Sequence, residues 1–363
     1  MSQIPVTVLT GYLGAGKTTL LNRILTEPHG KKYAVIVNEF GEIGIDNDLV
    51  VDTDEEVFEM NNGCICCTVR GDLIRIISTL LKRSGRFDGI IVETTGLADP
   101  APVAQTFFVD EDVREKTQLD AVITVVDAKH LLLRLADSNE AQEQIAFADI
   151  ILINKTDLVT PEELKKVEAA VKRINPYAVI HFTQKAEIDV NLLLDRGAFD
   201  LERILEANPG FLAEEDHHHH HDHHHHHHDH DHACDEHCDH EHHDHGHDHE
   251  CDEHCDHAEP NVIHDKGITS VSLRSDKPLI GDLFTRWIGD LTQEKGPDIL
   301  RLKGILAFEG EEERFVVQGV HMILDGDLQK PWGENEPRLS RLVLIGRNLD
   351  AKDLNEQFQA CVA

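Results

Sequence analysis

The chain has 363 residues, of which 40% are hydrophobic, and its formal net charge is -34. That length allows two domains, because single cores usually stop growing below about 250–300 residues. The negative charge argues against nucleic acid or an anionic membrane as the main partner. We see no signal peptide and no run near the roughly 20 apolar residues of a membrane-spanning helix, so we expect a cytoplasmic protein.

Short Val- and Ile-rich runs alternate with helical patterns through the first half of the chain. The predicted strands are Pro5–Thr10, Tyr33–Asn38, Gly89–Thr94, Ala121–Asp127, Asp149–Asn154 and Tyr177–Phe182. The predicted helices between them include Lys17–Leu25, Asp72–Arg83, Ala141–Ala148 and Pro161–Ile174. This alternation indicates a mostly parallel sheet with helices on both faces. We therefore predict a doubly wound α/β domain over residues 1–212.

The first predicted strand runs into Gly-Tyr-Leu-Gly-Ala-Gly-Lys-Thr, which matches the phosphate-binding loop of P-loop proteins and opens a helix. Backbone N–H groups of such a loop wrap phosphates, and the helix N-terminus adds positive potential. The residues predicted to bind nucleotide here are Gly11, Gly14, Ala15, Gly16, Lys17, Thr18 and Thr19. Lys17 should reach the β- and γ-phosphates, and the Thr18 hydroxyl should ligate Mg²⁺.

Two more strand ends carry residues suited to a nucleotide. One apolar strand ends in Glu-Thr-Thr-Gly, where Glu93 is a candidate for the Mg²⁺ shell or for positioning water, and Gly96 for sensing the γ-phosphate. Another strand is followed by Asn154, Lys155 and Asp157. The Asp157 carboxylate can accept from two donors on guanine that adenine does not present, so the predicted nucleotide is GTP. We expect the protein to hydrolyse it.

A cysteine-rich loop follows the strand-like segment Val57–Met60. It contains three cysteines within four residues: Cys64, Cys66 and Cys67. Thiolates favour Zn²⁺ and Cu⁺ and can hold Co²⁺ in tetrahedral geometry. Three local ligands leave one position for Glu39, Glu42, water or an incoming ligand, and an open site of this kind exchanges metal faster than a closed one. Both glutamates belong to a segment that we expect to respond to the nucleotide.

A tract between His217 and His257 holds 22 of the 27 histidines and two Cys-Asp-Glu-His-Cys units. Sixteen acidic side chains and no Lys or Arg lie between Glu214 and Asp256. Nothing in this composition could form a core, so we predict a flexible metal-binding linker over residues 213–260. Such a tract binds divalent metals by availability and does not identify one of them. A solubilising spacer is the alternative interpretation.

Regular patterns resume after the tract. Predicted strands are Ile268–Arg274, Leu300–Phe308, Arg314–Met322 and Arg341–Ile345, and predicted helices are Leu279–Thr292 and Asp350–Gln359. Ile280, Leu283, Phe284, Trp287, Ile288 and Leu291 should share one face of the first of these helices. We predict a small α+β domain with an antiparallel sheet over residues 261–363.

Taken together, the motifs GYLGAGKTTLLN, NEFGE, NGCICC, ETTGLADP and NKTD resemble those of the CobW-type metal-chaperone P-loop GTPases of the SIMIBI class. Within that family the combination is most similar to the zinc-regulated GTPase metalloprotein activators. The resemblance implies GTP-dependent transfer of zinc from the three cysteines to a client metalloenzyme, with GTP, Mg²⁺ and Zn²⁺ as cofactors. Related GTPases pair face to face around the nucleotide, which adds a nucleotide-dependent homodimer to the expectations.

Three other functions fit parts of the same sequence. A cobalt chaperone for cobalamin synthesis or for a cobalt enzyme would carry nearly the same motifs. A zinc buffer or storage protein would use the histidine tract but has no need of a complete guanine site. A translation or signalling GTPase has no use for Cys64, Cys66 and Cys67.

Overall fold

The computed structural model describes residues 3–38, 57–60, 68–82, 87–197, 267–333 and 336–363, with only the backbone described for 57–60 and 68–70. The chain up to Ala213 and from Asp265 onward forms one compact unit. The predicted linker of residues 213–260 lies outside the described residues. So do five predicted metal ligands: Glu39, Glu42, Cys64, Cys66 and Cys67. The predicted domain boundaries therefore stay predictions.

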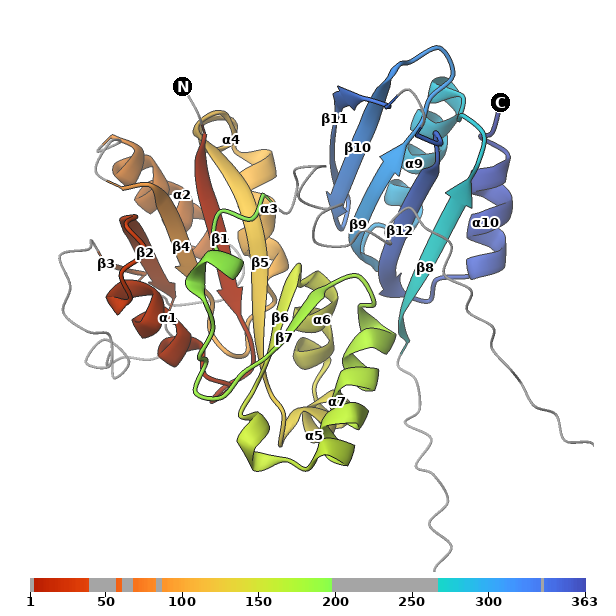
Figure 1. Cartoon of the computed structure of the whole chain (residues 1–363). Coiled ribbons are helices and arrows are strands. Elements are labelled where there is room, and N and C mark those ends of the chain that lie inside the picture. The colour runs from red at the N-terminus through yellow and green to blue at the C-terminus, as the bar shows by residue number, and fades with distance from the viewer. Residues whose placement is uncertain (1–2, 39–56, 61–67, 83–86, 198–266, 334–335) are drawn as a thin grey trace, which may run out of the picture. The chain divides into compact units, whose positions relative to one another are not determined.

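The first part of the chain forms a parallel sheet (Figure 1). Its described strands are β1 (Ile4–Thr10), β2 (Tyr33–Asn38), β3 (Val57–Met60), β4 (Gly89–Glu93), β5 (Thr117–Asp127), β6 (Ile150–Asn154) and β7 (Val179–Phe182). They lie in the order β3-β2-β4-β1-β5-β6-β7, and every pairing is parallel. The predicted parallel sheet is confirmed, and β1 lies near its centre.

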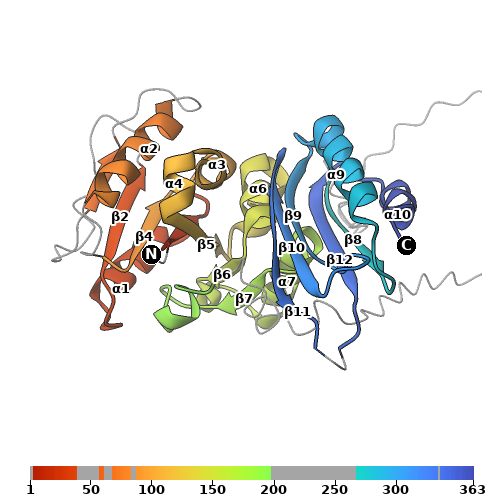
Figure 2. The same ribbon diagram turned by 90° about the horizontal axis from the view of Figure 1, so that it is seen from above.

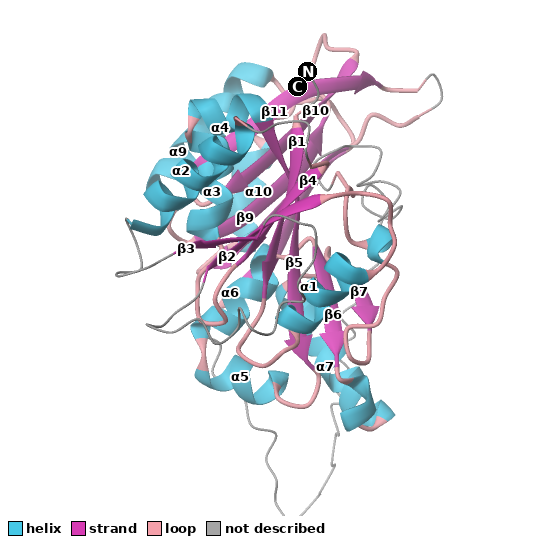
Figure 3. Cartoon of the chain, turned by 90° about the vertical axis from the view of Figure 1, so that its left-hand side faces the viewer, coloured by secondary structure: helices cyan, strands magenta, loops and turns pink. Residues whose placement is uncertain are grey.

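Helices cover both faces of this sheet (Figure 3). They are α1 (Lys17–Thr26), α2 (Thr68–Leu81), α3 (Ala101–Val109), α4 (Glu111–Lys116), α5 (Leu131–Asp137), α6 (Asn139–Phe147) and α7 (Pro161–Ile174). Alternate strand residues point to opposite faces. In β6, Ile151 and Ile153 belong to the apolar cluster that includes residues of α2 to α7, whereas Ile150 and Leu152 belong to the cluster that includes residues of α1. Burial on both faces explains why these strands are continuous apolar runs.

Local sequence determines where several helices begin. The Thr160 side chain accepts a hydrogen bond from the backbone of Glu163, whose carboxylate accepts from the backbone N–H of Thr160. This capping box precedes Pro161, the first residue of α7, and the predicted start is correct. Ser138 similarly caps α6 through the Ala141 N–H. None of the described helices is long and apolar enough to cross a membrane.

The C-terminal part forms an antiparallel sheet with helices on one side (Figure 2). It comprises β8 (Ile268–Ser275), α9 (Gly281–Lys295), β9 (Ile299–Leu306), β10 (Glu313–Val320), β11 (Ile323–Pro331), β12 (Ser340–Arg347) and α10 (Ala351–Gln359), with strand order β11-β10-β9-β12-β8. One face of the sheet packs on α9 and α10. Residues of the other face, including Ile305 and Ile345, join the apolar cluster that contains α6 and α7. The predicted α+β domain is confirmed.

Several details differ from the sequence prediction, and the helices α3, α4 and α5 were not named among the predicted helices. The strand β11 was not predicted, because as an edge strand it is half-exposed and shows no clean alternation of apolar residues. Leu283 was predicted on the buried face of α9 but is 37% exposed. The apolar stripe is narrower than the sequence suggests, and Phe284, Ile288 and Leu291 alone are fully buried in it.

Candidate nucleotide site

The nucleotide motifs meet at one edge of the parallel sheet. Leu9 near the end of β1 is paired with Glu93 at the end of β4, and Asp127 at the end of β5 is paired with Asn154 at the end of β6. In a parallel sheet all carboxyl ends lie at the same edge, which is where open α/β sheets bind their ligands. The fold therefore brings together three motifs that are far apart in sequence.

The phosphate loop has a backbone that only glycine adopts without strain. Gly11, Gly14 and Gly16 have φ values of 138°, 74° and 118°. A Cβ on Gly11 would lie 2.2 Å from the carbonyl oxygen of Val125, and one on Gly16 would lie 2.4 Å from Nδ2 of Asn154. The loop is thus packed against β5 and the Asn154 side chain, as its sequence requires.

Lys17 is the first residue of α1 and is buried, with 8% of its surface exposed. Its Nζ donates to the carbonyl oxygens of Gly11 at 2.8 Å and Tyr12 at 3.5 Å. The ammonium group is therefore held within the curve of the loop, where phosphate oxygens are the natural partners. Thr18 follows it and is half-buried, while Thr19 is exposed.

The segment after β4 packs directly on the phosphate loop. The Thr94 N–H donates to Leu9 O at 2.9 Å, and the Thr94 hydroxyl donates to the Thr10 hydroxyl at 2.9 Å. A Cβ on Gly96 would lie 2.6 Å from the backbone nitrogen of Leu13, so the two loops are in close contact. Glu93 ends β4 and is 7% exposed. Its role with Mg²⁺ or water stays a prediction.

Asn154 connects three loops of the site. Its Nδ2 donates to Ala15 O at 2.9 Å, and its Oδ1 accepts from the Thr183 hydroxyl at 3.1 Å and from the Ala186 N–H at 2.9 Å. The loop from Thr183 to Ala186 follows β7 and was not predicted as part of the site. The only sequence signal for it is its position after a strand that neighbours β6.

Lys155 has a left-handed backbone, with φ of 61°, and its Nζ donates to Oδ2 of Asp127 at 2.8 Å. The same carboxylate contacts Nδ1 of His130 at 3.0 Å and accepts from the Lys129 N–H at 2.9 Å. Burial raises the pKa of Asp127, but these hydrogen bonds outweigh it and hold the pKa below its ordinary value. Asp127 therefore stays ionised and anchors Lys155. Neither Asp127 nor His130 was among the residues predicted for the site.

Asp157 lies in the short helix η2 (Thr156–Leu158) and is exposed. The neighbouring Thr156 hydroxyl donates to Thr183 O at 3.1 Å, which ties η2 to the loop after β7. The Asp157 carboxylate is therefore accessible at the sheet edge, as recognition of a guanine base requires.

A cavity of about 500 Å³ adjoins the phosphate loop on the side of α5 and α6. Its described lining residues are Tyr12, Leu13, Gly14, Ala15, Val126, Asp127, His130, Leu131, Arg134, Ala141, Gln144 and Lys155. Arg134 lies over the Tyr12 ring, 5.2 Å from its centroid. The contributions of Arg134 and Gln144 were not predicted, because the sequence position of a polar residue does not show what its side chain faces, and α5, which carries Arg134, was not named among the predicted helices.

The predicted metal ligands fall on two segments whose flanking strands are described. Within the described residues, no group of three His, Cys, Asp or Glu side chains could hold a metal ion. The strands β2 and β3 end side by side, with Asn38 paired to Met60, and β2 also pairs with β4. Glu39 follows Asn38 directly, and Cys64 lies four residues beyond Met60 in the sequence.

Two family models match this chain. The model for the CobW/HypB/UreG nucleotide-binding domain covers residues 5–182. The model for the C-terminal domain of the cobalamin synthesis protein cobW covers residues 268–362. The two matches correspond to the parallel and the antiparallel sheet.

Individual relatives agree with the family models. The chain is 33% identical to the zinc chaperone YjiA of Escherichia coli over 99% of its own length and 98% of the relative's. It is 33% identical to the zinc chaperone CobW of Pseudomonas aeruginosa, covering 100% of this chain and 92% of that one. The crystal structure of Zn(II)-bound YjiA GTPase from E. coli matches with a TM-score of 0.71 and 30% identity, over 100% of both chains.

Proposed function

The chain belongs to the CobW/HypB/UreG family of P-loop GTPases, and we propose that within this family it is a zinc metallochaperone. In this proposal, GTP hydrolysis drives transfer of zinc from Cys64, Cys66 and Cys67 to a client metalloenzyme. Family membership makes the protein a GTP hydrolase with a metal-handling role. The identity of the metal, its ligands and its destination are the proposed part.

One structural relationship supports the coupling of metal to nucleotide. The strands β3, β2 and β4 are neighbours, with Asn38 paired to Met60 and Val37 paired to Glu93. Residues that follow these strands leave the sheet at the edge that holds the phosphate loop. Glu39 follows Asn38 directly and Cys64 lies four residues beyond Met60 in the sequence, and on this ground the proposal assigns both to the side of the sheet that holds the nucleotide. A change at the γ-phosphate could then alter the metal ligands directly.

Ligand chemistry and the named relatives favour zinc as the cargo. Three thiolates suit Zn²⁺, and they leave a fourth position for Glu39, Glu42, water or an incoming ligand, so that metal can exchange. YjiA of E. coli is named a zinc chaperone, and the matching crystal structure is its Zn(II)-bound form. The histidine tract would hold a reserve of the same metal close to the cysteines.

The nucleotide part of the proposal assigns a role to each motif. Lys17 would contact the β- and γ-phosphates, Thr18 would hold Mg²⁺, and Asp157 would select guanine. Glu93 would join the Mg²⁺ shell or position water. The Gly96 N–H would contact the γ-phosphate, because Gly96 packs on the phosphate loop. We further propose that the protein works in the cytoplasm and pairs with a second copy when nucleotide is bound.

Cobalt is the second candidate cargo. The observation that favours it is the match of residues 268–362 to the C-terminal domain of a cobalamin synthesis protein. Thiolates also hold Co²⁺ in tetrahedral geometry, so the donor atoms alone do not separate the two ions.

Metal affinity measured in defined nucleotide states tests the function. Zn²⁺ and Co²⁺ are titrated in competition into full-length protein with Mg²⁺ and a non-hydrolysable GTP analogue, with GDP, or without nucleotide. We expect Zn²⁺ to prevail and its affinity to differ by about 5- to 150-fold between the GTP-analogue and GDP states, the usual range of such coupling. Preference for Co²⁺ would support the second candidate, and equal Zn²⁺ affinity in all states would refute nucleotide-driven release.

Cysteine variants supply the control. Replacing Cys64, Cys66 and Cys67 together by Ser should weaken the tightest Zn²⁺ site by more than about 100-fold, since losing even a supporting group around a metal costs about 10- to 100-fold. Cys361→Ser is the matched control, because Cys361 is a free, buried cysteine in the C-terminal domain. A zinc buffer would behave differently: deletion of residues 214–256 would abolish function, and Lys17→Ala would leave it intact.

A further inference from the structure

We infer that α6 couples the C-terminal domain to GTP hydrolysis, with Gln144 as the residue that positions the loop beside the γ-phosphate. The inference concerns GTP turnover and does not depend on which metal is carried. It goes beyond the motifs of the nucleotide site, because Gln144 belongs to none of them. Three sets of contacts carry it: those of Gln144, those of its neighbour Glu143, and those just after the end of α6.

Gln144 holds the segment that follows β4. Its side chain is 1% exposed, and its Nε2 donates to Gly96 O and to Ala98 O, both at 3.2 Å. Its own backbone carbonyl accepts from the Thr124 hydroxyl of β5 at 2.7 Å. A buried amide that donates to two carbonyl oxygens of an irregular segment restrains that segment, because loss of the donor would remove this partner from both oxygens.

The segment held by Gln144 lies against the phosphate loop. Because a Cβ on Gly96 would come within 2.6 Å of the Leu13 nitrogen, the backbones of the two loops have no room between them. A small shift of Gly96 therefore changes where its N–H lies relative to the γ-phosphate. Misplacement of a catalytic group by about 1 Å can lower a rate about 100-fold, so the rate of GTP hydrolysis should depend on the position of this loop.

The next residue toward the N-terminus faces the C-terminal domain. The Glu143 carboxylate accepts from Nη2 of Arg347 in β12, and the Phe147 ring lies 5.6 Å from the His321 ring. Successive helix residues leave the axis about 100° apart. Gln144 and Glu143 therefore hold two different parts of the protein from the same turn of one helix.

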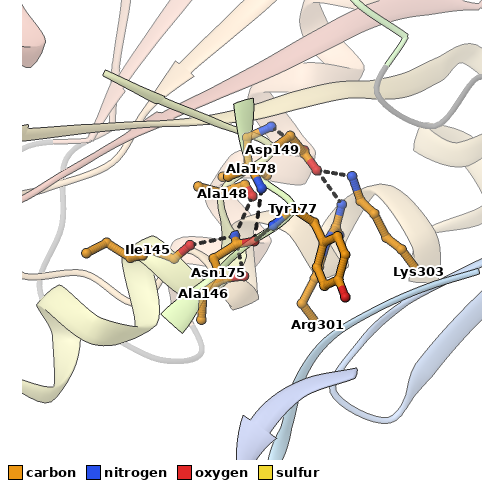
Figure 4. Close-up of polar contacts among 10 residues, drawn as sticks. Ile145, Ala146, Ala148, Asp149, Asn175, Tyr177, Ala178, Arg301 and Lys303 are labelled. Atoms are coloured by element: carbon orange, nitrogen blue, oxygen red, sulfur yellow. Dashed lines mark hydrogen bonds and ion pairs between the residues drawn. The ribbon is translucent and has the colours of Figure 1, made fainter. Parts of the chain in front are cut away.

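The end of α6 is attached to the C-terminal sheet as well (Figure 4). Asn175 Nδ2 donates to Ile145 O at 2.9 Å and to Ala148 O at 2.9 Å, which caps the helix. One residue further on, Asp149 accepts from Arg301 Nη2 at 3.1 Å and from Lys303 Nζ. Both cations come from β9. Hydrogen bonds and buried ion pairs thus leave α6 little freedom to move without the C-terminal sheet.

A rigid helix fixed at both sides transmits displacement. If GTP hydrolysis moves the Gly96 segment, Gln144 moves α6, and the C-terminal domain follows through Glu143 and Asp149. Linkage makes the effect reciprocal for binding: a partner that binds the C-terminal domain more tightly in one nucleotide state will favour that state. The expected consequence is that changes on the Glu143–Arg347 contact alter GTP turnover, although Arg347 lies in a different sheet.

The first test compares two glutamines of α6. Gln144→Leu removes the donor to Gly96 and Ala98, whereas Gln142→Leu removes a single hydrogen bond from Gln142 to Leu135 O within the α5–α6 region. For Gln144→Leu we expect kcat for GTP to fall about tenfold, equivalent to about 1.4 kcal/mol, with GDP affinity unchanged within about twofold. Gln142→Leu should keep kcat within about twofold. Equal kcat in both variants would overturn the positioning role.

The second test asks whether the contact between Glu143 and Arg347 affects GTP turnover through Gln144. Arg347 is partly exposed, so its replacement leaves the core intact. Arg347→Gln should lower kcat about threefold, and in combination with Gln144→Leu should add little to the tenfold loss, because both act on one element. Exchanging the charges, with Glu143→Arg and Arg347→Glu together, should restore kcat to within about twofold. Additive losses, or no effect of Arg347→Gln, would refute the coupling through α6.

Discussion

The side-chain Nδ2 of Asn154 donates a hydrogen bond to the backbone carbonyl oxygen of Ala15 at 2.9 Å, across 139 residues of sequence. This bond joins the guanine motif to the phosphate loop. Because Asn154 also accepts from Thr183 and Ala186, one buried side chain holds three of the loops that surround a nucleotide. Asn154 therefore has a structural task in addition to the nucleotide contact proposed for it.

Asn154→Ala should weaken GTP and GDP binding equally, by about tenfold or more, because the loops it joins contact both nucleotides. Its unfolding free energy should fall by about 2–4 kcal/mol. Asn175→Ala is a matched control: Asn175 is equally buried and bonds several backbone groups, but it lies away from the nucleotide loops. That variant should lose similar stability in urea unfolding and keep its nucleotide affinity. If it lost affinity to the same extent, the effect would be general destabilisation.

Substitution of two glycines with the same backbone conformation distinguishes the effect of backbone strain on stability from an effect on nucleotide binding. Gly14 and Gly30 have φ values of 74° and 73°, and a Cβ on either would meet nothing within 4 Å. Each Gly→Ala change should cost about 1 kcal/mol of stability, the price of a left-handed non-glycine residue. Only Gly14→Ala should also weaken GTP binding, measured by titration calorimetry, because its loop wraps the phosphates. Equal GTP affinity in the two variants would contradict the assignment of the loop.

Asp157→Asn should change the base that is preferred. An ionised carboxylate accepts from the N1 and amino donors of guanine, whereas an asparagine amide can donate to the carbonyl that xanthine carries in place of the amino group. We expect GTP affinity to fall about 100-fold or more, with xanthosine triphosphate becoming the better ligand. Because Asp157 is exposed, stability should change by less than about 0.5 kcal/mol. Unchanged preference for GTP over XTP would exclude Asp157 from base recognition.

Asp149→Asn should destabilise the protein by about 3–5 kcal/mol, because it leaves Arg301 and Lys303 without their buried counter-charge. Glu168→Gln, which breaks the exposed pair with Lys172, should cost about 0.5 kcal/mol or less. Both are measured by urea unfolding at neutral pH. A loss for Asp149→Asn as small as that for Glu168→Gln would show that the buried pair contributes little.

The same pair predicts a pH dependence. Burial raises the pKa of Asp149, but the Lys303 and Arg301 cations outweigh burial and hold that pKa below its ordinary value of 3.8. Burial also lowers the pKa of Lys303. Arg301 cannot lose its proton and stays a cation beside Asp149, so the Asp149 carboxylate stays ionised. The stabilisation is therefore complete above pH 3.8 and is lost as the pH falls through the lower, folded-state pKa. The stability gap between wild type and Asp149→Asn should therefore narrow as the pH falls through that acid range.

Sequence reasoning was most successful where chemistry is local. Three features depend on residues within a few positions of one another: the phosphate loop, the capping of α7 and the apolar strands. They can therefore be predicted from the sequence alone. It failed at β11, whose existence depends on pairing with β10 and not on its own composition. It also missed Asp127 and Gln144, since neither residue type signals which loop it will face.

By itself, therefore, the sequence determined the family, the parallel and antiparallel sheets, and the residue types available for GTP and for metal. Only the tertiary structure decided which distant residues act together. The contacts of Gln144 with Gly96 and of Asp149 with Arg301 span 48 and 152 residues. Hydrogen bonds and ion pairs act over about 3 Å. Local pattern cannot specify such pairs, because strand order and helix packing bring their members into that range.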